Sequence, residues 1–318
     1  MLKRIPVYIL TGFLGSGKTT LLKRMLNYVK TSGEKPALML NELGSENVEK
    51  ELFEDEAMIE LLNGCICCTI QDDMRGEIDE LLKSREDIDV LLIEGTGIAN
   101  PAEIIEALTH PDVIDKVDIQ SIIGVVDASR YLEYQSIFQS SKEIRTMLKQ
   151  QITSSTLLVV NKTDLLDEKN RVKVASKLEV LKMENTPMVY AQYGDVKSEL
   201  LFESRFFTNA LNMKDDLGGH HHHHHSHPFQ AIKIDGIEEV DKGSFEKWLK
   251  KQSKWLLRAK GYIHFKGNPQ PFSFQFASNQ LNITTIESDK ANCIILIGAR
   301  LDHEQIKQSF DQEVRQIV

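Results

Sequence analysis

The sequence has 318 residues, of which 41% are hydrophobic and 27% charged, and its formal net charge is -9 at pH 7. A chain of this length predicts two domains, because single hydrophobic cores rarely grow beyond about 250 residues. The acidic balance argues against a general nucleic-acid-binding protein, since phosphate backbones attract basic surfaces. No apolar stretch has membrane length, and the four cysteines fit a reducing compartment. We therefore expect a cytoplasmic protein without a nucleic-acid or membrane partner.

The first motif in the chain is Gly12-Phe13-Leu14-Gly15-Ser16-Gly17-Lys18-Thr19, between an apolar segment and a helical pattern. Its spacing fits the phosphate-binding loop, whose glycines let successive backbone N–H groups point into one concavity. Lys18 is expected at the β- and γ-phosphates, and the hydroxyl of Thr19 is expected to coordinate Mg²⁺. The residues expected to bind nucleotide here are Gly12, Gly15, Ser16, Gly17, Lys18, Thr19 and Thr20.

Apolar segments recur along the first two thirds of the chain, and most of them end in a polar group. The predicted strands are residues 7–10, 37–40, 90–93, 122–126, 157–160 and 188–191. Helical patterns between apolar strands predict an α/β fold, here a P-loop NTPase domain with a mostly parallel sheet covered by helices on both faces. Ligands of such sheets bind at the carboxyl ends of the strands, where these polar groups lie.

Three cysteines follow the second predicted strand, at positions Cys65, Cys67 and Cys68. Their thiolates favour Zn²⁺ or Cu(I) over Mg²⁺ or Ca²⁺. Three protein ligands leave one position open, which water, a side chain such as Glu42 or a group of a receiving protein could fill. The alternative is a buried, inert set of small residues, because free cysteine packs well.

Glu94 and Gly97 follow the predicted strand at residues 90–93. A carboxylate at this strand end reaches Mg²⁺, through water, when a phosphate loop lies beside it. Gly97 is expected to give the γ-phosphate a backbone N–H at close approach. Lys18, Thr19 and Glu94 are therefore the candidate catalytic residues. No arginine or glutamine stands out as a catalytic finger, so we expect slow intrinsic turnover.

Asn161-Lys162-Thr163-Asp164 is the second strong motif, again at a strand end. The Asp164 carboxylate can accept both N1–H and the exocyclic amine of guanine, a pair of donors that adenine does not offer. Asn161 is expected to bind N7 and hold the loop, and the stem of Lys162 is expected over the base. The alternative is a common polar turn.

The composition changes near residue 209, which predicts a P-loop domain over 1–208, a histidine-rich linker over 209–227 and a smaller α+β domain over 228–318. The linker histidines are His220, His221, His222, His223, His224, His225 and His227. Such a run binds Zn²⁺, Ni²⁺ or Co²⁺ with little geometric selectivity. The alternative is an engineered purification tag, although tags normally sit at a terminus.

Taken together, these motifs resemble the CobW-type metallochaperone GTPases over nearly the whole chain. Similar segments are Asn41-Glu42, residues 63–69, Glu94 to Gly97, residues 98–101, residues 161–164 and residues 257–261. The resemblance implies GTP hydrolysis with Mg²⁺, coupled to delivery of Zn²⁺, or of Co²⁺ or Fe²⁺ in some members, to a client metalloprotein. It also implies that Glu42 belongs to the first switch and that the three cysteines bind the cargo. Residues 45–48 depart from the family pattern.

Two other functions remain open from the residues. The chain could be a metal store or sensor in which the nucleotide regulates homo-oligomerisation, or a GTP-dependent switch that recruits proteins beside an incidental metal site. Metal stoichiometry separates these readings, because storage predicts several weakly held ions and a chaperone predicts one tightly held ion.

Overall fold

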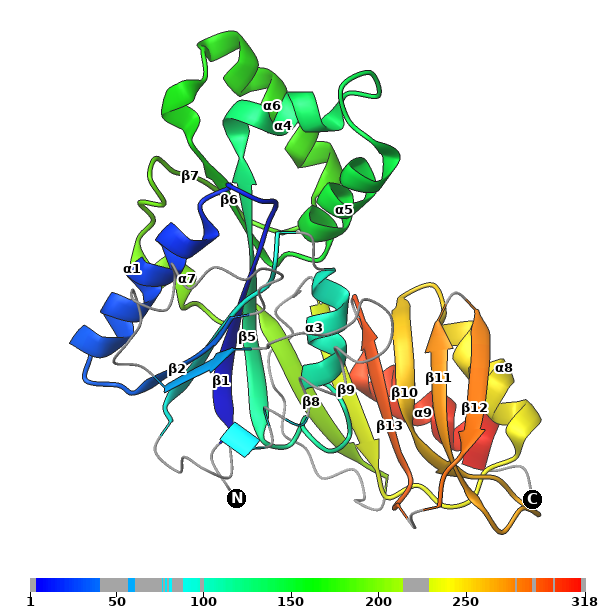
Figure 1. Ribbon diagram of the computed structural model, residues 1–318. Coiled ribbons are helices and arrows are strands. Elements are labelled where there is room, and N and C mark those ends of the chain that lie inside the picture. The colour runs from blue at the N-terminus through cyan, green and yellow to red at the C-terminus, as the bar shows by residue number, and fades with distance from the viewer. Residues whose placement is uncertain are drawn as a thin grey trace. The chain divides into compact units, whose positions relative to one another are not determined.

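The computed structural model describes residues 4–40, 57–60, 76, 78, 80–81, 88–97, 100–213, 229–277, 279–287, 290–299 and 301–315. Contacts divide the chain into two compact units, the first Met1–Leu108 with Val113–Arg205 and the second Thr109–Asp112 with Phe206–Val318. Each unit contains one sheet (Figure 1). Among the described residues, no helix is long and apolar enough to cross a membrane.

The sheet of the first unit is parallel throughout and has the order β3-β2-β4-β1-β5-β6-β7. Its strands are β1 (Ile5–Thr11), β2 (Pro36–Leu40), β3 (Ala57–Glu60), β4 (Val90–Glu94), β5 (Val117–Asp127), β6 (Leu157–Asn161) and β7 (Met188–Tyr190). Strands β2 and β6 are buried at every position. Burial on both faces explains why these strands are continuous apolar runs, and it confirms the predicted α/β class.

Helices cover both faces of this sheet. They are α1 (Lys18–Thr31), α3 (Pro101–Leu108), α4 (Ala128–Gln135), α5 (Lys142–Thr153), α6 (Glu168–Leu181) and α7 (Ser198–Leu201), with a short 3₁₀ turn η2 (Thr163–Leu165) after β6. One core joins α1 and α7 to residues such as Leu10 and Val125. The other joins α4, α5 and α6 to Val126, Leu158 and Val160, which point to the opposite face.

The second unit is a mixed sheet with the order β12-β11-β10-β13-β9-β8. Its strands are β8 (Phe206–Asn212), β9 (Phe229–Asp235), β10 (Leu256–His264), β11 (Pro271–Ala277), β12 (Gln280–Thr285) and β13 (Cys293–Gly298). Helices α8 (Lys242–Gln252) and α9 (His303–Phe310), with the turn η3 (Asp311–Arg315), pack on alternate residues of these strands. Trp248 and Phe310 meet edge to face in this core, with ring centroids 5.0 Å apart. This is the expected smaller α+β domain.

The start of the second unit differs from the boundary at 208/209 that composition predicts. Strand β8 begins at Phe206 and runs in parallel beside β9 to Asn212, so residues 209–212 belong to the sheet and not to the linker. Main-chain pairing forms this strand, and its polar residues Thr208 and Asn209 give no strong apolar alternation from which to predict it.

Candidate nucleotide site

The predicted phosphate and base motifs lie at the carboxyl ends of neighbouring parallel strands. Strand β1 stands between β4 and β5, and Leu10 pairs in register with Glu94. Strand β5 stands beside β6, and Asp127 pairs in register with Asn161. Four strand ends therefore present their polar residues at one edge of the sheet, where ligands of parallel sheets bind.

The phosphate loop depends on glycine at two positions where the backbone passes close to other groups. Gly12 has φ 146°, and a Cβ there would lie 2.2 Å from the Val125 carbonyl oxygen. Gly17 has φ 101°, and a Cβ there would lie 2.4 Å from Asn161 Nδ2. Glycine lets the loop lie against strand β5 on one side and against the base motif on the other.

We expect Gly17→Ala to weaken GTP binding at least about tenfold, because the added methyl group displaces the Asn161 amide and adds left-handed strain of about 1–2 kcal/mol. Gly33→Ala is the matched control, since Gly33 also has positive φ, at 80°, but a Cβ there meets nothing within 4 Å. Fluorescence titration measures the affinity for GTP, and thermal unfolding measures the loss of stability caused by the backbone strain. Equal GTP affinities of the two variants would contradict the role of the close contact.

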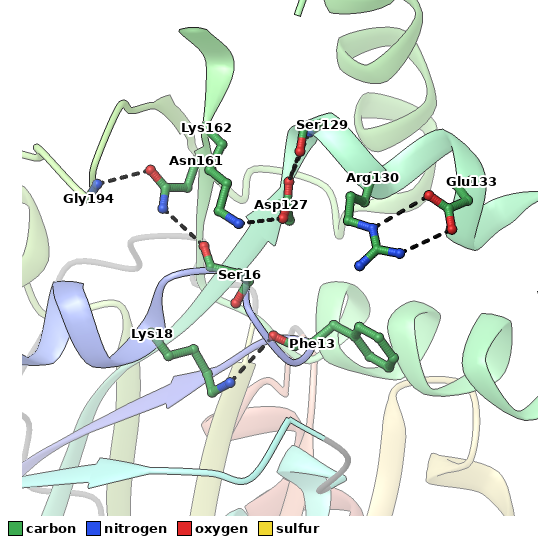
Figure 2. A network of polar contacts seen from close by, with 10 residues as sticks. All are labelled: Phe13, Ser16, Lys18, Asp127, Ser129, Arg130, Glu133, Asn161, Lys162 and Gly194. Atoms are coloured by element: carbon green, nitrogen blue, oxygen red, sulfur yellow. Dashed lines mark hydrogen bonds and ion pairs between the residues drawn. The ribbon is translucent and has the colours of Figure 1, made fainter. Parts of the chain in front are cut away.

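The donors of the loop converge on the carbonyl oxygen of Phe13. Lys18 Nζ donates to this oxygen at 3.4 Å (Figure 2). The Ser16 N–H donates to it at 3.1 Å. The Lys18 side chain is largely buried, with 7% of the residue exposed. The Ser16 hydroxyl is fully buried and makes no hydrogen bond within the described part of the chain. One backbone N–H and the Lys18 ammonium group therefore share one oxygen acceptor in the loop.

Thr19 and Glu94 come together from two different elements. Thr19 lies in the first turn of α1, Glu94 ends β4, and Thr19 Oγ1 donates to Glu94 Oε1 at 3.1 Å. A hydroxyl and a carboxylate are the oxygen ligands that Mg²⁺ accepts in proteins. The two residues expected beside magnesium are thus neighbours.

Gly97 lies against the phosphate loop. A Cβ on Gly97 would lie 2.5 Å from Leu14 Cγ, and its carbonyl oxygen accepts a hydrogen bond of 3.1 Å from Gln151 Nε2 of α5. Gln151 is only 2% exposed. Gly97 is therefore held between the phosphate loop and the buried Gln151 amide of α5.

Asn161 is a bridge between two loops. Its Nδ2 donates to the Ser16 carbonyl oxygen at 3.0 Å, and its Oδ1 accepts from the Gly194 N–H at 2.9 Å (Figure 2). Asn161 is 2% exposed, so both bonds are shielded from water. Its amide thus connects the phosphate loop to the loop at Gly194, and the predicted contact with guanine N7 stays a prediction.

Lys162 and Asp164, the other two predicted base-binding residues, differ in their surroundings. Lys162 has a left-handed backbone, with φ 60°, and its Nζ forms an ion pair of 2.7 Å with Asp127 Oδ2. Asp164 is exposed, and among the described residues its carboxylate has no hydrogen-bond or ion-pair partner. The Asp164 carboxylate is therefore accessible to a ligand and can accept two hydrogen bonds.

The predicted cargo ligands lie outside the described residues. They are Glu42, Cys65, Cys67, Cys68, His220, His221, His222, His223, His224, His225 and His227. Within the described ranges, no group of three or more His, Cys, Asp or Glu side chains is arranged to hold a metal ion. The expected cysteine site therefore stays a prediction.

Three contributors to the site were not assigned a role from the sequence: Asp127, Gln151 and Gly194. Asp127 ends an apolar strand, as Glu94 and Asn161 do, so its place at a strand end is a usable signal. Gln151 and Gly194 carry no such signal, because each acts through one contact with a residue distant in the sequence.

Two family descriptions match the chain. The one described as CobW/HypB/UreG, nucleotide-binding domain, matches residues 6–189, and the one described as Cobalamin synthesis protein cobW C-terminal domain matches residues 229–314.

Named relatives include the zinc chaperone YjiA of Escherichia coli K12, which is 29% identical over 325 residues that cover 96% of this chain and 98% of the relative. The zinc chaperone CobW of Sinorhizobium sp is 29% identical over 221 residues, and this match spans only 62% of the relative's length. The zinc-regulated GTPase metalloprotein activator 1 of Dictyostelium discoideum is 33% identical over 204 residues, or 42% of its length. The crystal structure of Zn(II)-bound YjiA GTPase from E. coli aligns with 98% of this chain and 99% of that chain, at 24% identity and a TM-score of 0.46.

Proposed function

The chain belongs to the CobW/HypB/UreG family of P-loop GTPases, and we propose that it uses GTP hydrolysis to deliver a transition metal, with Zn²⁺ as the favoured cargo, to a client metalloprotein. The observation that carries the nucleotide half of this proposal is the collection of phosphate-binding and base-binding groups at one sheet edge. Lys18 and Thr19 follow β1, Glu94 ends β4, and the motif from Asn161 to Asp164 follows β6.

The phosphate loop fits a nucleotide because its donors already surround an oxygen acceptor. In the proposed bound state, phosphate oxygens take the place of the Phe13 carbonyl oxygen as partner of Lys18. The buried Ser16 hydroxyl gains a partner there as well. A phosphate oxygen carries negative charge, so it pairs with the Lys18 ammonium group more strongly than the neutral Phe13 carbonyl oxygen does.

The neighbouring oxygens of Thr19 and Glu94 fit Mg²⁺ as the partner of the nucleotide. When bound, Mg²⁺ neutralises the charge that develops on the β- and γ-phosphates. Thr19 then acts as a ligand from the first turn of α1, and Glu94 orients ligand water from the end of β4. Asp164 selects guanine, because its carboxylate accepts two donors at once.

The metal half of the proposal rests on Cys65, Cys67 and Cys68 and on the names of the relatives. Three thiolates with one position open suit an ion that must be handed on, because the free position admits a ligand from the client. Two of the relatives reported above are called zinc chaperones, and a third is called a zinc-regulated GTPase metalloprotein activator. Glu42 and the histidine run of 220–227 are proposed as further, weaker ligands.

Metal titration of the full-length protein with GTP, with GDP and without nucleotide tests the proposal. We expect one tightly bound Zn²⁺ whose affinity differs at least about fivefold between the GTP and GDP forms, because coupling between sites is typically worth 1–3 kcal/mol. Reciprocity requires Zn²⁺ to change the ratio of the GTP and GDP affinities by the same factor. Cys67→Ser is expected to remove the tight ion and leave GTP binding intact.

Other outcomes point to other functions. Several weakly held ions that disappear on deletion of residues 220–227 would favour storage. Client binding that survives loss of all three cysteines would favour a recruiting switch. Equal Zn²⁺ affinity in every nucleotide state would contradict coupled delivery.

A further inference from the structure

The Asp127 carboxylate makes two different contacts at the end of β5. Its Oδ1 accepts from the Ser129 N–H at 3.0 Å and from the Ser129 hydroxyl at 2.5 Å, which caps the N-terminus of α4. Its Oδ2 forms the ion pair of 2.7 Å with Lys162 Nζ, and Figure 2 shows both contacts side by side. The Asp127 side chain is only 4% exposed, so the pair is largely shielded from solvent on the aspartate side.

Lys162 depends on this pair to hold one conformation. A lysine side chain has four flexible carbons and no planar group to fix its direction. One third of the Lys162 side chain is exposed, with a relative accessibility of 33%, so packing covers part of its stem and does not by itself fix the direction of the ammonium group. Among the described residues, the ion-pair partner of the Lys162 ammonium group is the buried Asp127 carboxylate.

Asp127 is itself fixed in two ways. It pairs in register with Asn161 across β5 and β6, and its own side chain caps α4. Helix α4 is anchored through Tyr131, which is 1% exposed, and through Tyr134, whose ring lies 4.8 Å from the ring of Phe13. Helix α4 thus contacts the phosphate loop through Tyr134, and its N-cap residue Asp127 contacts Lys162 of the base motif.

Arg130 also lies near Asp127, and its recorded hydrogen bond goes to Glu133. Arg130, on the same helix, donates to Glu133 Oε1 at 3.2 Å and lies over the Tyr134 ring, 5.0 Å from its centroid. The hydrogen bond to Glu133 raises the pKa of Arg130. Lys162 is therefore the basic partner that Asp127 Oδ2 has in this structure.

We propose that Asp127 is a positioning residue for nucleotide binding, which holds the Lys162 stem in place for the base of the nucleotide. This inference rests on the proposed guanine-nucleotide site. Its physical basis is preorganisation, because a side chain that is ordered before binding loses less conformational freedom when the ligand arrives. The base is common to GTP and GDP, so loss of Asp127 should weaken both nucleotides alike.

Asp127→Asn tests the proposal, because asparagine keeps the capping oxygen for Ser129 and removes the charge that pairs with Lys162. Asp167→Asn is the matched control. Asp167 also caps a helix, with Oδ1 accepting from the Asn170 N–H at 2.7 Å, and its other oxygen accepts from the Asn170 side chain. Calorimetric titration of the full-length protein with GDP and with GTP is the measurement, with thermal unfolding recorded for each variant.

We expect Asp127→Asn to weaken GDP and GTP about tenfold each, and Asp167→Asn to change neither more than about twofold. The KM for GTP should rise by the same factor as the dissociation constant, while kcat at saturating GTP stays within about twofold. In a Lys162→Met background, Asp127→Asn should cause no further loss, because residues that act through one another are not additive.

Three results would overturn the proposal. They are equal GDP affinities of the two aspartate variants, an additive effect in the Lys162→Met background, and a loss confined to kcat. Asp127→Ser, which keeps a capping hydroxyl without a carboxylate, replaces Asp127→Asn if that variant does not fold. Failure of the unaltered protein to bind GDP or GTP would instead contradict the proposed function.

Discussion

Lys18→Ala is expected to lower kcat for GTP hydrolysis about 100- to 1000-fold. Lys18 is largely buried and already directs its ammonium group at the oxygen acceptor in the centre of the phosphate loop. A positive charge at such a position stabilises the negative charge that develops on the transferred phosphoryl group. Loss of one preorganised hydrogen-bond donor lowers kcat by about two to three orders of magnitude in comparable sites. Phosphate release under saturating GTP and Mg²⁺ measures this effect.

Lys23→Ala is the matched control for this prediction. Lys23 lies on the same helix α1 but is exposed, so its replacement by alanine removes one positive charge and leaves the phosphate loop unaltered. We expect it to hydrolyse GTP at the rate of the unaltered protein. Turnover by Lys18→Ala within tenfold of that rate would rule out the assigned role of the loop, provided that both variants unfold at similar temperatures.

Much of the nucleotide site could be predicted because its residues are close in sequence to the elements that place them. The phosphate loop lies between β1 and α1, and Glu94 and Asn161 each end an apolar strand. A strand end fixes where a side chain lies as soon as the sheet is known to be parallel. Local pattern and fold class were therefore sufficient for these positions.

The residues that escaped prediction act through contacts between distant segments. Gln151 reaches Gly97 from α5, and the Gly194 N–H reaches Asn161 from the loop after β7. Such contacts depend on how helices and loops pack, and one sequence carries no pattern for them. Asp127 is intermediate, because its strand end was visible but its pairing with Lys162 required the order β5-β6.

Strand β8 illustrates a second limit, at the boundary between the units. Its sequence, residues 206–212, contains polar positions and ends near the histidine run, so composition assigns part of it to a linker. Pairing with β9 fixes it instead, through backbone hydrogen bonds that any sequence without proline can form. The edge of a sheet is therefore harder to predict than its centre.

Asp164→Asn is expected to change which base the site prefers. Guanine presents two donors, N1–H and the exocyclic amine, and the Asp164 carboxylate can accept both. An asparagine offers one acceptor and one donor, which matches xanthine, whose exocyclic position carries a carbonyl oxygen. We expect GTP affinity to fall about 1000-fold and affinity for xanthosine triphosphate to rise above it, because a site built to hydrogen-bond one base strongly rejects a base that leaves those groups unpaired.

Competition titrations with GTP, xanthosine triphosphate and ATP measure this preference. Asp167→Asn, three residues further along, makes the same chemical change at a helix cap and is expected to keep the preference for GTP. A parallel loss of all three nucleotides in Asp164→Asn would mean that the residue supports the loop and does not recognise the base. A switch toward xanthine would instead assign base recognition to the exposed carboxylate at the end of β6, beside the lysine that Asp127 holds in place.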